Sequence, residues 1–172
     1  MVLDARLAKL ARGVTAAQAA RAPVADAHVE SVSPGDGQAA EFEAILEAMF
    51  LMAAVDGEVS EQELEQLRAS IQAIADLHVV QSSRVAELLD ECGDRLANEG
   101  WHARLASIKA RIPTPEGRAF AFRLAGAVAF VDDHVAHAEA AAIDALAAAL
   151  ELPADESQAI LREVADELFG RA

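Results

Sequence analysis

The 172-residue chain has a single cysteine, Cys92, no tyrosine, and aromatic residues at only 4% of its positions. One cysteine excludes an internal disulfide and a metal site built from several thiolates, and its leucine neighbours indicate a small buried or half-buried side chain rather than a nucleophile. Hydrophobic residues make up 53% of the chain, so its core has to be built mainly from alanine, leucine, valine and isoleucine. Because alanine is the strongest helix former and lets helix axes approach closely, this composition favours packed helices.

Long apolar runs are also lacking. None reaches the roughly 20 residues that span a bilayer. The N-terminus has no uninterrupted apolar stretch of the signal-peptide kind, because Arg6, Lys9 and Arg12 break it up. We therefore expect a cytoplasmic protein with no direct membrane insertion.

Basic residues are few, since 14 Lys and Arg stand against 29 Asp and Glu for a net charge of -15. Residues 1–38 hold four of each sign, so the acidic excess lies in 39–172. Such a body repels phosphate backbones, which argues against nucleic acid and favours cations or basic protein surfaces as partners. Basic residues dominate only one segment, which we interpret as a solvated face that neutralises the acidic halves, or alternatively as a docking patch for an acidic partner. They are Arg95, Arg104, Lys109, Arg111, Arg118 and Arg123.

Hydrophobic periodicity divides the chain into three parts. Residues 1–22 predict an appended amphipathic helix, and residues 23–38, with two prolines and two glycines, predict a flexible linker. In 39–172, apolar residues recur at spacings of three and four, which predicts an all-α domain of about seven helices in a compact antiparallel bundle. The predicted helices cover 39–55, 61–76, 82–98, 101–112, 115–131, 136–150 and 154–169.

One pattern near residue 50 recurs near residue 130. In each copy an apolar helical run meets an acidic corner, after which a second helix starts. This predicts an internal duplication of a helix-corner-helix unit, with repeats over about 39–98 and 114–170. An offset of 76 aligns Val55 with Val131, Asp56 with Asp132, Val59 with Val135 and Glu63 with Glu139.

The first corner, Asp56-Gly57-Glu58-Val59-Ser60-x-x-Glu63, resembles the second half of an EF-hand loop. The first half is missing, because its leading ligand positions fall on Met52 and Ala54, which cannot bind calcium. A structural interpretation explains much of the pattern: Ser60 and Glu63 form a capping box, and the other acids lie near a helix N-terminus, where negative charge is favourable.

The second corner keeps two of the aligned acids and adds His134 and His137, which capping does not explain. Oxygen and imidazole donors so close together are compatible with a divalent cation, Ca²⁺ or Mg²⁺ before Zn²⁺ or Mn²⁺. The sequence contains no glycine-rich phosphate loop, nucleophile elbow or Cys/His pair, so we expect no enzymatic activity. The candidate metal ligands are Asp56, Glu58, Glu63, Asp132, Asp133, His134, His137 and Glu139.

The paired corners, Val55 to Glu63 and Val131 to Glu139, make the chain similar to the TerB-like family of tellurite-resistance proteins over about 39–170. In that family the helical domain also occurs attached to a membrane-anchored J-domain co-chaperone. The resemblance implies about seven helices, an acidic metal-associated surface, and a role in bacterial tellurite or chemical-stress response within a larger assembly. The second corner of this sequence departs from the family pattern at Asp133, His134 and Ala136, which shifts its candidate metal ligands from oxygen donors toward a mixture of oxygen and nitrogen donors.

Membership in an assembly implies a protein partner and leaves the oligomeric state open between a monomer and a homodimer. The alternative function is a pure interaction or scaffold module with no metal role, recruited by the N-terminal helix or the basic segment.

Overall fold

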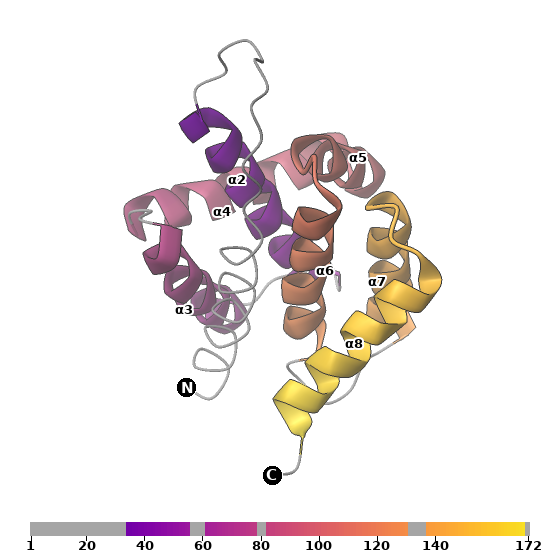
Figure 1. The fold of residues 1–172 in the computed structure, drawn as a ribbon. Helices are drawn as coiled ribbons and strands as arrows, with labels where there is room; N and C mark the ends of the chain where they lie inside the picture. The colour runs from indigo at the N-terminus through magenta and orange to yellow at the C-terminus, as the bar shows by residue number, and fades with distance from the viewer. Residues whose placement is uncertain (1–33, 56–60, 79–81, 131–136, 171–172) are drawn as a thin grey trace.

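The computed structural model describes residues 34–55, 61–78, 82–130 and 137–170. Within these ranges the chain forms seven helices and no strand, which confirms the all-α prediction (Figure 1). The internal duplication and the N-terminal helix at 1–22 stay predictions, the latter because it lies outside the described ranges. The helices are α2 (Pro34–Ala53), α3 (Glu61–His78), α4 (Ser82–Glu99), α5 (Trp101–Arg111), α6 (Pro115–Ala129), α7 (His137–Ala149) and α8 (Ala154–Phe169).

Local sequence explains where several helices begin. The Thr114 side chain accepts a hydrogen bond from the backbone N–H of Gly117 at 3.1 Å, and Pro115 occupies the first position of α6, where the predicted helix 115–131 also starts. Helix α2 begins at Pro34, inside the predicted linker 23–38, so the prediction is wrong for 34–38. Proline at a first helical position has no N–H to leave unpaired, so the composition that indicates a linker also suits a helix start.

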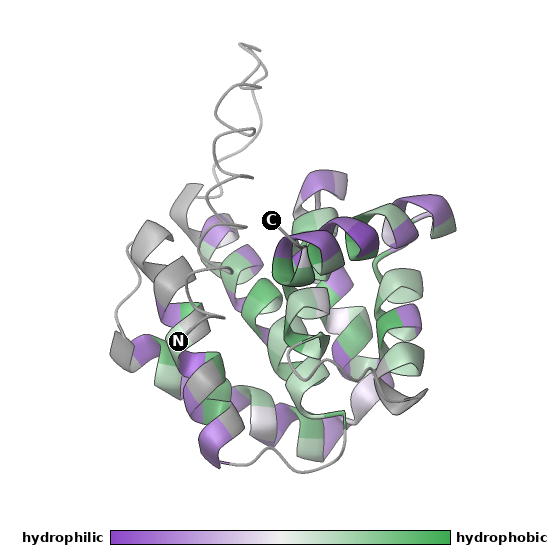
Figure 2. Cartoon of the chain, turned by 90° about the horizontal axis from the view of Figure 1, so that it is seen from below, coloured by the Kyte–Doolittle hydropathy of each residue, from purple (hydrophilic) through white to green (hydrophobic). Residues whose placement is uncertain are grey.

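Helix α2 forms the centre of the structure. It packs most extensively against α6 and also contacts α3, α4, α5 and α7. Its stretch from Ala44 to Met52 is buried throughout, including one charged residue, Glu47. On the surrounding helices buried hydrophobic residues alternate with exposed polar ones, and the ribbons of Figure 2 accordingly alternate between green and purple. The largest fully buried side chains are Phe122, Leu46, Met49, Leu51, Ile71, Leu89, Ile108, Ile112, Leu124, Leu146 and Leu150.

Helices α2 and α6 run in the same direction through the middle of the structure, from the top of Figure 1 toward its lower half. Small residues on the α2 side of α6 let the two axes approach, since Gly117 lies against Glu41 and Gly117, Ala121 and Ala125, spaced four residues apart, are all buried. This pair determines where the chain enters its two acidic corners, because one corner follows each helix.

Candidate functional site

Most of the predicted metal ligands lie outside the described residues. Asp56 and Glu58 belong to 56–60, and Asp132, Asp133 and His134 belong to 131–136. The remaining three lie on described helices whose side chains at these positions are not described: Glu63 is in α3, and His137 and Glu139 are in α7. Among the side chains that the structure does describe, no group of three His, Cys, Asp or Glu is arranged to hold a metal ion. The eight-residue metal site therefore stays a prediction.

The helices that lead into the two corners are aligned with each other. A Cβ atom added to Gly117 of α6 would overlap a carboxylate oxygen of Glu41, so these two positions lie against each other. From Glu41 to the end of α2 at Ala53 is twelve residues, and from Gly117 to the end of α6 at Ala129 is also twelve. At 1.5 Å per residue both helices advance about 18 Å from this shared level. Their C-terminal ends therefore point to the same end of the bundle.

A buried ionic cluster links α2 to α5. The Glu47 carboxylate, only 1% exposed, accepts hydrogen bonds from Arg104 Nε at 2.5 Å and Arg104 Nη2 at 2.9 Å. Arg111 Nη2 donates to the same carboxylate, and Arg104 Nη1 donates to Glu99 at 2.8 Å. Sequence reasoning missed this cluster. Its available signal was a single acid inside the apolar run from Ala44 to Ala54.

The cluster controls the charge states around it. Burial by itself raises the pKa of Glu47, but the hydrogen bonds and charges of Arg104 and Arg111 outweigh burial and hold that pKa below its ordinary value. The Glu47 hydrogen bond, the largest cause, raises the pKa of Arg104. Nearby, burial raises the pKa of the Cys92 thiol to about 12, and the negative charge of Glu47 adds to this rise. Cys92 is 3% exposed, which confirms the prediction of a small buried side chain.

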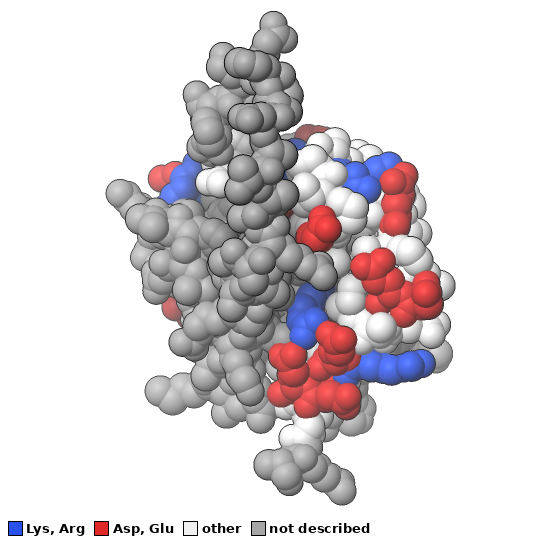
Figure 3. Space-filling view, viewed as in Figure 1, with Lys and Arg blue, Asp and Glu red and all other residues white. Residues whose placement is uncertain are grey.

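The basic segment from Arg95 to Arg123 has its predicted neutralising role, but its cations are not all solvated. Arg104 is buried rather than solvated, because it pairs with Glu47 in the core. The other five cations also pair with acids, so the segment neutralises acidic helices, as predicted, but offers no unpaired cation for an acidic partner. Figure 3 shows basic side chains bordered by acidic ones on one face. The surface pairs are Arg95–Glu91, Lys109–Glu151, Arg118–Glu151, Arg123–Glu163 and Arg123–Glu167, and Arg111 pairs with Glu47.

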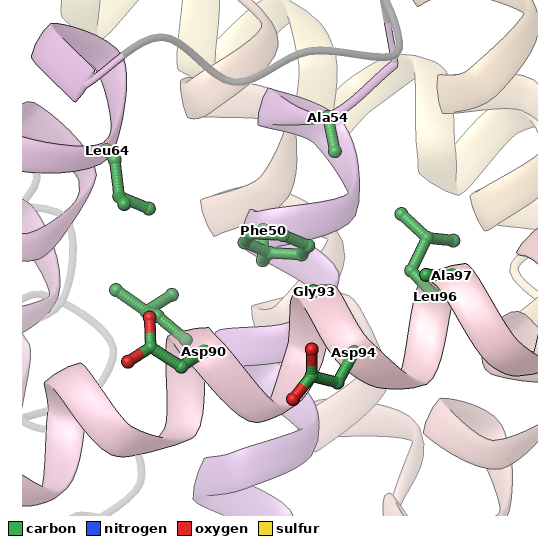
Figure 4. A pocket seen from close by; sticks show the side chains of 9 residues that line it. Phe50, Ala54, Leu64, Asp90, Gly93, Asp94, Leu96 and Ala97 are labelled. Atoms are coloured by element: carbon green, nitrogen blue, oxygen red, sulfur yellow. The ribbon is translucent and has the colours of Figure 1, made fainter.

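A groove of about 700 Å³ lies between α2, α3 and α4 (Figure 4). Its walls are mainly apolar, and two carboxylates, Asp90 and Asp94, lie along its α4 side. Ala54 and Leu64 also line it, and they flank the first acidic corner in the chain. Two lining residues of the groove therefore flank the first predicted ligand segment along the chain. The remaining lining residues are Phe50, Leu89, Gly93, Leu96 and Ala97.

Comparison with known protein families covers most of the helical domain. The family described as "Tellurite resistance protein TerB" matches residues 42–163, more than two thirds of the chain, from the middle of α2 into α8. No curated protein and no solved structure matches the chain. Within the described ranges, no helix is long and apolar enough to cross a membrane.

Proposed function

Because the chain belongs to the TerB family of tellurite resistance proteins, we propose that it is a non-enzymatic, cytoplasmic component of a bacterial tellurite or chemical-stress response. In this proposal its two acidic corners bind a divalent cation, a basic protein partner, or both. The observation that supports it is the shared direction of α2 and α6, which directs both corners to one end of the bundle.

Acidic residues from two corners at one end favour cation binding for an electrostatic reason. Each corner alone supplies three candidate carboxylates, whose six oxygens reach only the lower end of the six to eight oxygen ligands that Ca²⁺ takes. Combined, the corners supply enough oxygens, and the repulsion among their negative charges is relieved when a divalent cation binds. His134 and His137 add nitrogen donors, which extend the site toward Mn²⁺ or Zn²⁺.

Calorimetric titration with Ca²⁺, Mn²⁺ and Zn²⁺ tests the cation proposal. We expect saturable binding to the wild-type chain, strongly reduced binding to Asp56→Ala plus Asp132→Ala, and intermediate binding to either single variant. Asp144→Ala plus Asp166→Ala removes the same number of carboxylates from exposed positions on α7 and α8 and is the matched control. Equal heats in the control and the corner variant, or negligible heats throughout, would reject a cation role.

The described titratable groups support the absence of catalysis. Glu47 is held ionised by two arginines and is shielded from solvent, so it is not available as a general acid or base. The Cys92 thiol is buried and, with a pKa of about 12, protonated at neutral pH, so it is no nucleophile.

The groove beside the first corner favours the second candidate function, an interaction or scaffold module. Its lining is mainly apolar and carries two exposed carboxylates, which are complementary to apolar and basic side chains of a protein partner. Recruitment through the N-terminal helix remains part of this alternative. The basic segment does not, because every one of its cations is paired with an acid of this chain.

A further inference from the structure

The carboxylates on α4 fall into two groups according to where they lie. The three glutamates pair with arginines: Glu87 and Glu91 with Arg84, Glu91 also with Arg95, and Glu99 with Arg104. The two aspartates along the groove, Asp90 and Asp94, are exposed and make no ion pair or hydrogen bond with any part of the chain that the structure describes. They lie four residues apart on one helix, where like charges repel. The groove edge therefore carries two negative charges that the described fold leaves without a counter-charge.

Gly93 lies between these aspartates, in the interior of α4, and lines the groove. Glycine in a helix interior costs about 1 kcal/mol relative to alanine. The fold does not require it, because a Cβ atom there would meet only Phe50 Cζ, at 3.8 Å, an ordinary contact. The buried ring of Phe50 lies directly behind Gly93, so the missing side chain deepens the groove at this point (Figure 4). Glycine at this position widens the groove at a cost to the helix.

We propose that the groove between α2, α3 and α4 docks a cationic amphipathic helix of a partner protein. Leucine-like side chains of that helix enter at Gly93, between the half-buried Leu64 and Leu96. Lysine or arginine side chains three or four residues apart on the docked helix match Asp90 and Asp94, because residues at that spacing lie on one helix face. The inference rests on the partner-binding half of the proposed function and needs no metal site.

The test measures binding of a fluorescent peptide to the full-length chain by anisotropy. The probe is a designed helix of about 18 residues with leucines at spacings of three and four, flanked by lysines. A second peptide replaces each lysine with glutamate. We expect saturable binding of the lysine peptide that weakens as salt is added, and no binding of the glutamate peptide.

Two variants alter the groove in independent ways. Asp90→Asn plus Asp94→Asn removes both charges, and we expect the dissociation constant to rise about tenfold. Gly93→Leu fills the groove beside Phe50 and is expected to weaken binding at least as much. Gly93→Leu also exchanges glycine for a strong helix former in α4, so it should unfold at no lower temperature than the wild type. Asp144→Asn plus Asp166→Asn, which removes two exposed aspartates elsewhere, should bind the peptide as the wild type does.

Four results of these experiments would overturn the docking proposal. Equal binding of the two peptides, or equal binding to wild type and to both groove variants, excludes the groove as a cationic docking site. Leu7→Asp plus Leu10→Asp replaces two apolar residues of the predicted N-terminal helix 1–22 by charged ones, and if the lysine peptide binds only to this variant, that helix is the occupant. A homodimer in light scattering that Asp90→Asn plus Asp94→Asn dissociates assigns the groove to a second copy. Loss of corner-dependent metal heats leaves this inference intact, and loss of peptide binding leaves the metal proposal intact.

Discussion

Replacing Glu47 by glutamine tests the buried cluster that joins α2 to α5. The substitution keeps the shape of the side chain and removes its charge. In the folded wild type this carboxylate accepts two hydrogen bonds from Arg104 and one from Arg111. In Glu47→Gln the two guanidinium groups face each other without the anion between them.

The exposure of the three groups determines the magnitude. Removing one partner of a buried ion pair costs about 3–5 kcal/mol, because the remaining charge stays in a poorly solvated place. Arg111 is 21% exposed and can turn toward water, and Arg104 keeps its pairing with the half-exposed Glu99. We therefore expect the free energy of unfolding to fall by about 3 kcal/mol, the lower end of that range.

Urea unfolding followed by far-UV circular dichroism measures this change. Glu87→Gln is the matched control, since it makes the same chemical change at an exposed ion pair on α4 and should cost no more than about 1 kcal/mol. The double variant Glu47→Leu plus Arg104→Leu removes both buried charges and should be more stable than Glu47→Gln. A loss below about 1 kcal/mol in Glu47→Gln would refute the argument that the cluster is buried and intact.

The same variant changes how stability depends on pH. The pKa of Glu47 is lower in the folded chain than its ordinary value of 4.5, so the ionised carboxylate stabilises the fold above that pH. This stabilisation is lost as the pH falls through the depressed pKa of the folded state. The difference between wild type and Glu47→Gln should therefore be constant near neutral pH and shrink under acid conditions below pH 4.5.

Three further predictions follow from individual positions. Gly117→Ala should lower the free energy of unfolding by about 1–3 kcal/mol in chemical denaturation, because the new Cβ overlaps Glu41 and lies 2.9 Å from Ile112 Cγ2. Gly93→Ala is the control and should leave the free energy of unfolding unchanged or raise it, so equal effects at the two glycines would contradict the argument. Glu151 has a φ of 57°, a backbone conformation that glycine adopts without strain. Glu151→Gly and Glu151→Ala both lose the ion pairs of Glu151, so Glu151→Gly should melt at the higher temperature, and the reverse order would refute the presence of backbone strain. Cys92 should resist a thiol reagent at mildly alkaline pH until urea unfolds the chain, and rapid native labelling would contradict its burial.

Local patterns in the sequence predict most of the helices. Thr114 and Pro115 determine the start of α6 through a cap and a fixed φ angle, which act within one helical turn. The start of α2 is less determinate, because Pro34 and the glycines after it suit a linker and a first helical turn alike.

Contacts between distant parts of the chain escape sequence reasoning. Glu47 is visible as a lone acid in an apolar run, but its partner Arg104 is 57 residues away, and no local pattern links the two. The sequence alone therefore predicts that Arg104 is a solvated surface cation, like its neighbours in the basic segment. The groove is similar, because Asp90 and Asp94 become a distinct pair only once α2, α3 and α4 surround it. For the corners, the sequence predicts the ligand types, and the shared direction of α2 and α6 comes only from packing.

The distance between the two corners tests the central claim most directly. Spin labels attached to Glu58→Cys and Asp133→Cys in one chain report it by pulsed electron paramagnetic resonance, and Cys92 can remain because its buried thiol does not react. Helices packed side by side have axes about 8–10 Å apart, so we predict a narrow distribution centred below about 25 Å once the label arms are included. A distribution centred near 40 Å, about the diameter of a compact chain of this length, would place the corners on opposite sides and contradict a joint site.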